Sequence, residues 1–321
     1  MTSTNQVDAS LLHASGGGED LESVCYLCLD AGEESLRRDC ACRGSDAGFV
    51  HLSCLAGYAA NKSKQTNSMI EFRKPWRDCP GCHQCSQNEF AVDIASKFVS
   101  FVRGHYPNNT ERQVESIHSK LRALSSMIDR LQPVQKKELG VTANVLLSLI
   151  DRMKGEVLTL PKRYSQFEAD AYNVHGRIAL DEGTEESARR AVAHFEKDLK
   201  VCESIGNADG IATAKRNIAI AKSKYEGGRN NEELLRASQE LYEMRIAEFG
   251  DEHYYTIDAG IDYAIYLQKS NRREEARELL MKLLATSKQV FGSDHNITKS
   301  VARAQLINAL MHNVPNTAES M

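Results

Sequence analysis

The sequence predicts a small metal-stabilised module followed by an all-α region of stacked helix pairs. Cysteines and one histidine are concentrated between residues 25 and 82, and the module is expected over residues 21–90. From Phe90 onward, apolar residues recur at the spacing of a helix face. A segment that begins at Phe249 is echoed at Phe291, a shift of 42 residues, and a fixed shift of this size is typical of stacked helix pairs.

Residues 1–20 are expected to be a disordered leader. They are rich in Ser, Thr and Asn, contain the glycine run Gly16–Gly18, and lack the basic start and apolar stretch of a secretory signal. The longest later apolar run, around Val145 to Ile150, is too short to cross a bilayer. We therefore expect a soluble intracellular protein, in the cytoplasm rather than the nucleus, with no membrane partner. The net charge of -4 gives no reason to expect a nucleic-acid partner.

Eight residues of the module have the spacing of zinc ligands. They follow the pattern CxxC, eleven residues, CxC, eight residues, HxxC, twenty-four residues and CxxC. Zinc binds thiolate and imidazole ligands in tetrahedral sets, and cysteines at these spacings in a reducing compartment are metal ligands rather than disulfides. The sequence therefore predicts two zinc ions per chain, held by Cys25, Cys28, Cys40, Cys42, His51, Cys54, Cys79 and Cys82.

This ligand order, with CxC as the second pair, resembles the RING-CH (RING-variant) zinc finger over residues 25–82. The plant homeodomain finger has the same ligand order but different spacing around the second pair and the histidine. The resemblance implies a short helix that starts near His51 and an interleaved arrangement of ligands. In that arrangement one zinc is held by Cys25, Cys28, His51 and Cys54, and the other by Cys40, Cys42, Cys79 and Cys82.

The resemblance also implies a ubiquitin ligase. RING-type domains bind a ubiquitin-conjugating enzyme in a shallow apolar groove, and Leu27, Tyr58 and Pro80 match its usual lining. Trp76, the single tryptophan of the chain, either joins this groove or forms the small core of the module. Such a ligase needs no covalent catalytic residue, because it acts by holding the charged enzyme and the substrate together.

Two features leave other interpretations open. His83 follows Cys82, where many active RING domains carry a basic residue, and a histidine is only partly charged near neutral pH. Cys85 forms a second CxxC with Cys82, which permits a shifted ligand register. His83 therefore favours a non-enzymatic adaptor as the alternative function, and the ligand order shared with the plant homeodomain finger gives a reader of histone tails as a further alternative.

Between the module and the repeats, residues 91–165 are expected to form a helical connector. Pro107 separates a first helix from a second, Pro133 ends the second helix near Gln132, and a further helix spans about 138–153. The apolar positions that mark the first two helices are Ile94, Phe98, Phe101, Val102, Ile117, Leu121, Leu124, Ile128 and Leu131.

The repeats are expected over residues 166–314, before a disordered tail at 315–321. First helices are expected near 171–180, 208–225 and 255–270, and a capping helix near 298–312. These units resemble the tetratricopeptide repeats (TPR) of kinesin light chains, with a generic helical solenoid as the alternative. The resemblance implies that a protein or peptide substrate binds the concave face of the first helices. The candidate contact residues are Tyr172, Asn173, Arg177, Lys215, Asn217, Tyr263 and Tyr266.

Overall fold

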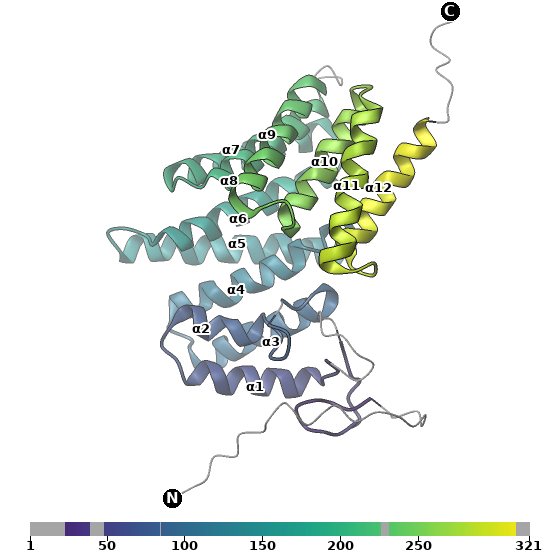
Figure 1. Ribbon diagram of the computed structural model, residues 1–321. Coiled ribbons are helices and arrows are strands. Elements are labelled where there is room, and N and C mark those ends of the chain that lie inside the picture. The colour runs from purple at the N-terminus through teal and green to yellow at the C-terminus, as the bar shows by residue number, and fades with distance from the viewer. Residues whose placement is uncertain (1–22, 39–47, 84, 226–230, 313–321) are drawn as a thin grey trace, which may run out of the picture. The chain divides into compact units, whose positions relative to one another are not determined.

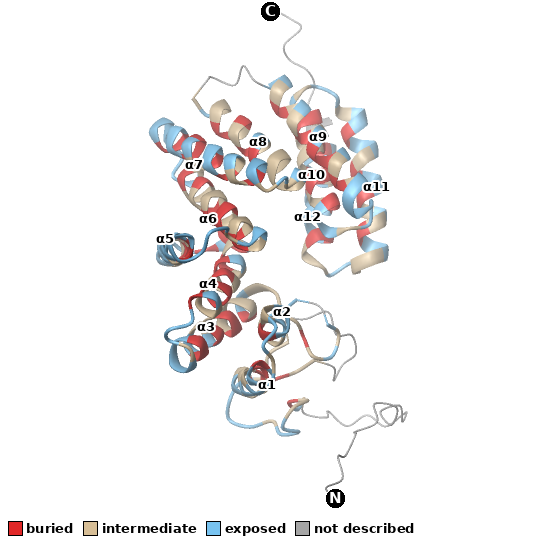
Figure 2. Cartoon of the chain, turned by 90° about the vertical axis from the view of Figure 1, so that its left-hand side faces the viewer, coloured by how far each residue is buried: buried red, intermediate tan, exposed pale blue. Residues whose placement is uncertain are grey.

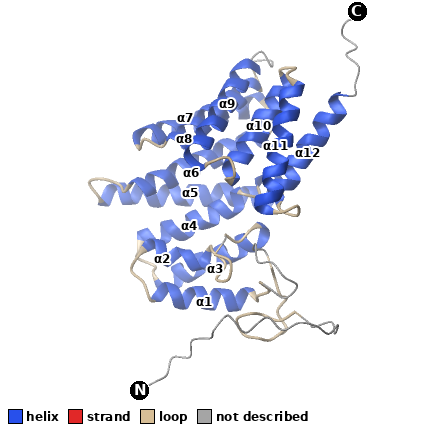
Figure 3. Ribbon diagram, in the orientation of Figure 1, coloured by secondary structure: helices blue, strands red, loops and turns tan. Residues whose placement is uncertain are grey.

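The structure is a computed structural model that describes residues 23–38, 48–83, 85–225 and 231–312. These residues form helices and loops (Figure 1 and Figure 3), and their β-structure is limited to isolated bridges, Arg37 with Val50 and Asp78 with Cys85. The chain divides into two compact units, an N-terminal unit (Met1–Lys97) and a C-terminal unit (Phe98–Met321). The boundary falls inside helix α3 (Asn88–His105). The finer division into finger, connector, repeats and tail remains a prediction.

The N-terminal unit is a small loop-rich module built around short helices. α1 (Leu52–Lys64) starts directly after His51 and packs against α2 (Met69–Arg73) and the 3₁₀ turn η2 (Lys74–Trp76). The side chains of Phe72 and Trp76 are buried between these elements. Ser63 joins them, because its hydroxyl accepts a hydrogen bond from Trp76 Nε1 at 2.8 Å and donates one to the Phe72 carbonyl at 2.7 Å.

The C-terminal unit contains a helical array, the series α4 to α12, in which each helix packs against the next. Its helices show buried stripes and exposed stripes (Figure 2), as expected for amphipathic helices in a stack. None of the described helices is both long and apolar enough to cross a membrane. The array consists of α4 (Thr110–Ser125), η3 (Ile128–Arg130), α5 (Pro133–Glu156), α6 (Lys162–Asp181), α7 (Glu185–Ser204), α8 (Ala208–Ser223), α9 (Asn231–Phe249), α10 (Tyr254–Lys269), α11 (Arg273–Phe291) and α12 (Asn296–His312).

Two helix boundaries differ from the sequence prediction. α4 ends at Ser125 and is followed by the turn η3, so the helix does not continue to Gln132 as expected. Pro133 instead opens α5, a position where its missing N–H and fixed φ are well tolerated. α6 begins at Lys162, earlier than expected, and its added first turns bury Tyr164 and Phe167.

The echo between residues 249 and 291 is a repeated turn between helices. Gly250 and Gly292 have φ values of +83° and +85°, which favour glycine at this position. Phe249 stacks on His253 at a centroid distance of 4.8 Å, and Phe291 stacks on His295 at 4.9 Å. In both turns the histidine Nδ1 accepts a hydrogen bond from a backbone N–H two residues later and so caps the next helix.

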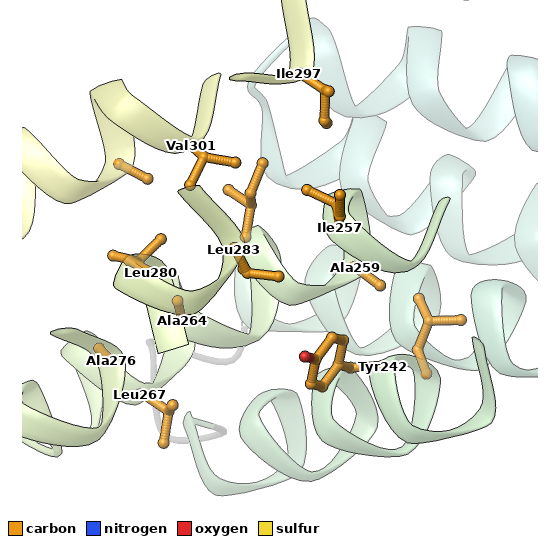
Figure 4. Packing of buried hydrophobic residues seen from close by; sticks show 13 residues of the cluster. Tyr242, Ile257, Ala259, Ala264, Leu267, Ala276, Leu280, Leu283, Ile297 and Val301 are labelled. Atoms are coloured by element: carbon orange, nitrogen blue, oxygen red, sulfur yellow. The ribbon is translucent and has the colours of Figure 1, made fainter. Parts of the chain in front are cut away.

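The core of the last repeats lies between α9, α10, α11 and α12 (Figure 4). Small residues of α10 let the neighbouring helices approach closely. A Cβ added at Gly260 would lie 2.8 Å from Leu283 Cδ1 and 3.0 Å from Tyr242 Cε2, so this glycine touches both α11 and α9. The apolar cluster includes Tyr242, Ile257, Ala259, Ala264, Leu267, Ala276, Leu280, Leu283, Ile297 and Val301.

Candidate metal centre and partner-binding surfaces

Four predicted zinc ligands converge in the N-terminal unit. The ligand atoms of Cys25, Cys28, His51 and Cys54 all lie within 4.8 Å of one another. Cys28 Sγ is 3.4 Å from His51 Nδ1, and Cys54 Sγ is 3.7 Å from the same nitrogen. A tetrahedral zinc with Zn–S of about 2.3 Å and Zn–N of about 2.0 Å requires S–N separations of roughly 3.5 Å. The four side chains therefore fit one zinc ion, and they are the set that the interleaved arrangement assigns to one site.

The imidazole of His51 is oriented for this role. Its Nε2 lies 2.8 Å from the carbonyl oxygen of Ala31, so Nε2 carries the proton and Nδ1 is left as the ligand atom. The ring is also held by Gly32, which has φ +58° and where a Cβ would lie 3.0 Å from His51 Cε1. Only a glycine accommodates both this backbone conformation and this close approach.

The thiols of the cluster have the electrostatics of a cation site. Burial raises the pKa of Cys25, but backbone hydrogen bonds from His51, Cys28 and Leu27 more than offset it and lower the pKa to about 7. Burial, followed by the neighbouring thiols of Cys28 and Cys25, raises the pKa of Cys54 to about 11. A divalent cation relieves this crowding of sulfur atoms, because it favours the thiolate form of every ligand.

The second CxxC pair has the same backbone turn as the first. The N–H of Leu29 donates to the Cys25 carbonyl at 2.8 Å, and the N–H of His83 donates to the Cys79 carbonyl at 2.9 Å. Leu29 and His83 have positive φ values of 61° and 58°. This turn directs both cysteines of a pair toward one ion. Cys79 and Cys82 thus share the backbone turn of Cys25 and Cys28, and we call the turn at Cys79–Cys82 the second knuckle.

The remaining ligands predicted for a second zinc, Cys40 and Cys42, lie outside the described residues. Cys85, which offered a shifted register, lies across an isolated bridge from Asp78, and its Sγ is 3.5 Å from Asp78 Oδ1. Among the described residues, Cys79, Cys82 and Cys85 do not form a three-ligand cluster. The shifted register stays a prediction, because the pair that would complete it, Cys40 and Cys42, lies outside the described residues.

A pocket of about 370 Å³ adjoins the second knuckle. Tyr58 from α1 and Pro80 from the knuckle both line it, so two of the predicted groove positions lie together. His83 also lines the pocket, and Lys62 Nζ is 5.9 Å from the centre of the Tyr58 ring. The complete lining is Tyr58, Lys62, Thr66, Glu71, Lys74, Pro75, Asp78, Cys79, Pro80 and His83.

The other two groove positions lie elsewhere. Trp76 is only 3% exposed and belongs to the interior of the module, which corresponds to the core role considered for it. Leu27 is half-buried between the first two ligands and does not line the pocket.

In the array, polar side chains connect the first helices of successive pairs. Arg177 of α6 donates to Ser125 Oγ of α4 at 2.9 Å, and Arg122 of α4 donates to Tyr255 Oη of α10 at 2.8 Å. Arg216 of α8 pairs with Asp262 of α10 at 2.7 Å. We call this surface the first-helix face; it is formed by Arg122, Ser125, Arg177, Arg216, Tyr255, Asp258 and Asp262.

The charges of the first-helix face influence one another. Burial and then the neighbouring Asp262 raise the pKa of Asp258, although Arg216, Arg245 and Arg177 lower it. Arg216 Nε is buried and has no hydrogen-bond partner among the described residues. This face therefore presents guanidinium and carboxylate groups that are partly desolvated, a setting in which polar recognition is strong.

The repeat pattern predicts Arg177 but none of the other charged members of this face, which are Arg122, Arg216, Asp258 and Asp262. Arg216 directly precedes the candidate Asn217, which is itself buried. Tyr172 lies instead in a pocket of about 450 Å³ with Lys154, Lys197 and Lys200.

The remaining array candidates have varied surroundings. Asn173 donates to Asp198 Oδ2 at 3.0 Å, and Lys215 is exposed. Tyr263 stacks on Tyr242 at 6.0 Å, and Tyr266 is buried. The tyrosines therefore contribute mainly to packing between helices.

A match to a protein-family model supports the repeats. A family model described as tetratricopeptide repeat matches residues 263–297, which span the end of α10, α11 and the start of α12. Among solved structures, the chain is similar to BtubC (BKLC) from P. vanneervenii, with 16% identity over 73% of this chain and 96% of that chain and a TM-score of 0.43. It is also similar to the nearly identical TPR-like repeats of a putative kinesin light chain from Podosopora anserina, with 14% identity, 74% and 95% coverage and a TM-score of 0.38.

No curated protein matches the chain. The family match, together with the repeated turns and packed helices described above, identifies a tetratricopeptide repeat within an array of stacked helix pairs.

Proposed function

We propose that the chain is a zinc-binding scaffold whose helical array binds protein partners on the first-helix face. The observation that carries this proposal is the row of arginine and aspartate side chains that links α4, α6, α8 and α10. Helical repeat arrays expose such extended surfaces, and arginine is favoured where carboxylates are recognised. Partners are expected to offer carboxylate groups to Arg177 and Arg216.

A comparative interaction experiment tests this function. The intact chain and an Arg177→Glu/Arg216→Glu variant are used as baits in cells, and the captured proteins are quantified by mass spectrometry. A matched control is Arg189→Glu, a charge reversal at an exposed arginine of α7. The proposal expects a set of partners that the control retains and the double variant loses. Identical sets for all baits would contradict a binding role of this face.

A more specific function is that of a ubiquitin ligase, in which the module binds a ubiquitin-conjugating enzyme. The pocket that brings Tyr58 and Pro80 together beside the second knuckle supports it. In this reaction the module would hold the charged enzyme while the array holds the substrate, and the acceleration comes from orientation alone.

Ubiquitin-chain formation with a panel of conjugating enzymes tests the ligase. Tyr58→Ala and Pro80→Ala should lose activity while keeping zinc, and Cys79→Ser should lose activity together with zinc. A wild-type protein that binds zinc but is silent across the panel would leave the scaffold as the function.

We also propose that the second knuckle completes a second zinc site with Cys40 and Cys42. The support is the shared turn of the two CxxC pairs, including the positive φ of Leu29 and His83. Metal analysis of anaerobically purified protein should give two zinc ions per chain. One zinc ion per chain would contradict the second site and leave a single site, formed by Cys25, Cys28, His51 and Cys54.

A further inference from the structure

Helix α12 has an exposed apolar face. The exposed fractions of Leu306, Ile307 and Leu310 are 61%, 49% and 61%. Beside them runs a groove of about 670 Å³ between α11 and α12, to which α11 contributes the exposed Met281. Apolar side chains grouped in this way are typical of a contact surface.

The internal repeat shows what kind of element this face accepts. The shift of 42 residues places Ala302, Leu306 and Ala309 of α12 at the positions of Gly260, Ala264 and Leu267 of α10. In α10 all three positions are buried and form a packing face for α11. Gly260 faces Leu283 of α11, and Figure 4 shows Ala264 and Leu267 on the side of α10 that carries the cluster with Leu280 and Ala276. In α12 the same three positions are exposed. The exposed face of α12 is therefore a packing face for a helix that runs antiparallel to it, as α11 runs antiparallel to α10.

Helix α11 contacts the packing face of α10 through a single row of side chains. The inward side chains of α11 are Ala276, Leu280 and Leu283, at positions i, i+4 and i+7. Ala302, Leu306 and Ala309 have the same spacing. The same three residues of α12 therefore match both the packing face of α10 and the row of α11 side chains that packs on it. A surface that is complementary to itself in this way suits a two-fold interface, in which the paired helices run antiparallel.

We propose that α12 is a homodimer interface, in which α12 of a second copy packs antiparallel on this packing face. The contact is confined to the last turns of α12, because Lys299 and Arg303 stand where α10 has Ile257 and Ile261. The groove floor also contains Asn308, whose buried Oδ1 has no hydrogen-bond partner in the described structure. The dimer would cover this acceptor together with the leucine face.

Sedimentation velocity on the full chain, over a concentration series in the micromolar range, tests this interface. The wild-type protein is expected to shift from monomer to dimer. Leu306→Asp should weaken the dimer by about 100-fold or more, because each dimer contains the substitution twice at the centre of the contact. The matched control is Val141→Asp, which changes an apolar residue of α5 that is 54% exposed and lies outside this groove.

Thermal unfolding of both variants checks that the array stays folded, and Leu310→Asp provides an independent substitution in the same face. A wild-type protein that is monomeric throughout, or a dimer that Leu306→Asp and Leu310→Asp leave intact, would overturn the proposal.

Discussion

The two units of the chain are stabilised by different interactions. Of the twelve largest fully buried side chains among the described residues, the N-terminal unit contributes only Phe72 and Ile94. The C-terminal unit contributes the other ten and extends the same packing from one helix pair to the next. A module with so small a core needs a further source of stability, which four converging ligands can supply, whereas a helical array gains stability from every neighbouring interface.

The largest difference between the units is expected on removal of metal. Chelation should unfold the N-terminal unit, because structural zinc sites contribute about 10–16 kcal/mol to folding at neutral pH. The array has no ligand of the converging set and should keep its helices. Hydrogen exchange measured segment by segment, with and without chelator, checks this. Equal loss of protection in α1 and α10 would contradict the separation, as would unchanged protection in both.

The array should instead respond to pH through two titratable side chains of α7, His194 and Asp198. Burial, and then the nearby His175, Lys197 and Arg190, lower the pKa of His194 to about 4, whereas burial raises the pKa of Asp198 to about 6. The folded state therefore disfavours the charged histidine, and this contribution to stability is lost as pH falls from about 6.5 toward 4. The buried Asp198 acts in the opposite sense, because stability is gained as pH falls through about 6.

Substitutions at these positions separate the two effects. From about pH 7 to pH 4.5, Asp198→Asn should lose roughly 2 kcal/mol more stability than the wild type, and His194→Gln should lose less than the wild type by a similar amount. Chemical unfolding of the array at both pH values measures the difference. A change of the same sign in both variants would refute the assignment.

Close packing predicts the next effect. A Cβ at Gly176 of α6 would lie 2.3 Å from Cε1 of the fully buried Phe195, so Gly176→Ala should destabilise the array by about 2 kcal/mol. Gly140→Ala is the control, because its Cβ would meet only Ile178 Cδ1 at 3.7 Å. It should stabilise α5 by about 0.5–1 kcal/mol through helix propensity. Urea unfolding distinguishes the two signs, and zinc content should be unchanged in both variants.

Local sequence patterns account for much of this architecture. The spacing of CxxC and HxxC predicts the ligand pairs, since each pair is fixed by a turn of a few residues, and the resemblance to the RING-CH finger implies which two pairs converge. The echo of Phe249 at Phe291 predicts the repeated turns, because the phenylalanine, glycine and histidine each have a local role there. Pro133 was misread, since a proline is compatible with both the region after a helix and its first turn.

Contacts between distant segments could not be read in this way. Arg122 and Tyr255 are 133 residues apart, and their hydrogen bond depends on how the first helices stack. Tyr172 and Arg177 were expected on one face, yet five residues rotate a helix by roughly 140°, so they point to different surfaces. The angle between Tyr172 and Arg177 follows from their spacing in the sequence. The contact of Gly32 with His51 is visible only in the structure, because it depends on how two separate loops approach each other.

The contact between Gly32 and His51 predicts a smaller effect than Gly176→Ala and provides the closest test of the metal centre. Gly32→Ala should weaken zinc binding by about tenfold, because a methyl group at this left-handed position displaces the imidazole and its bond to the Ala31 carbonyl. Competition with a chromogenic chelator measures the affinity. Gly57→Ala is the control, since its Cβ would meet nothing within 4 Å. Equal affinities in the two variants would show that the carbonyl bond, rather than this close approach, orients the ring.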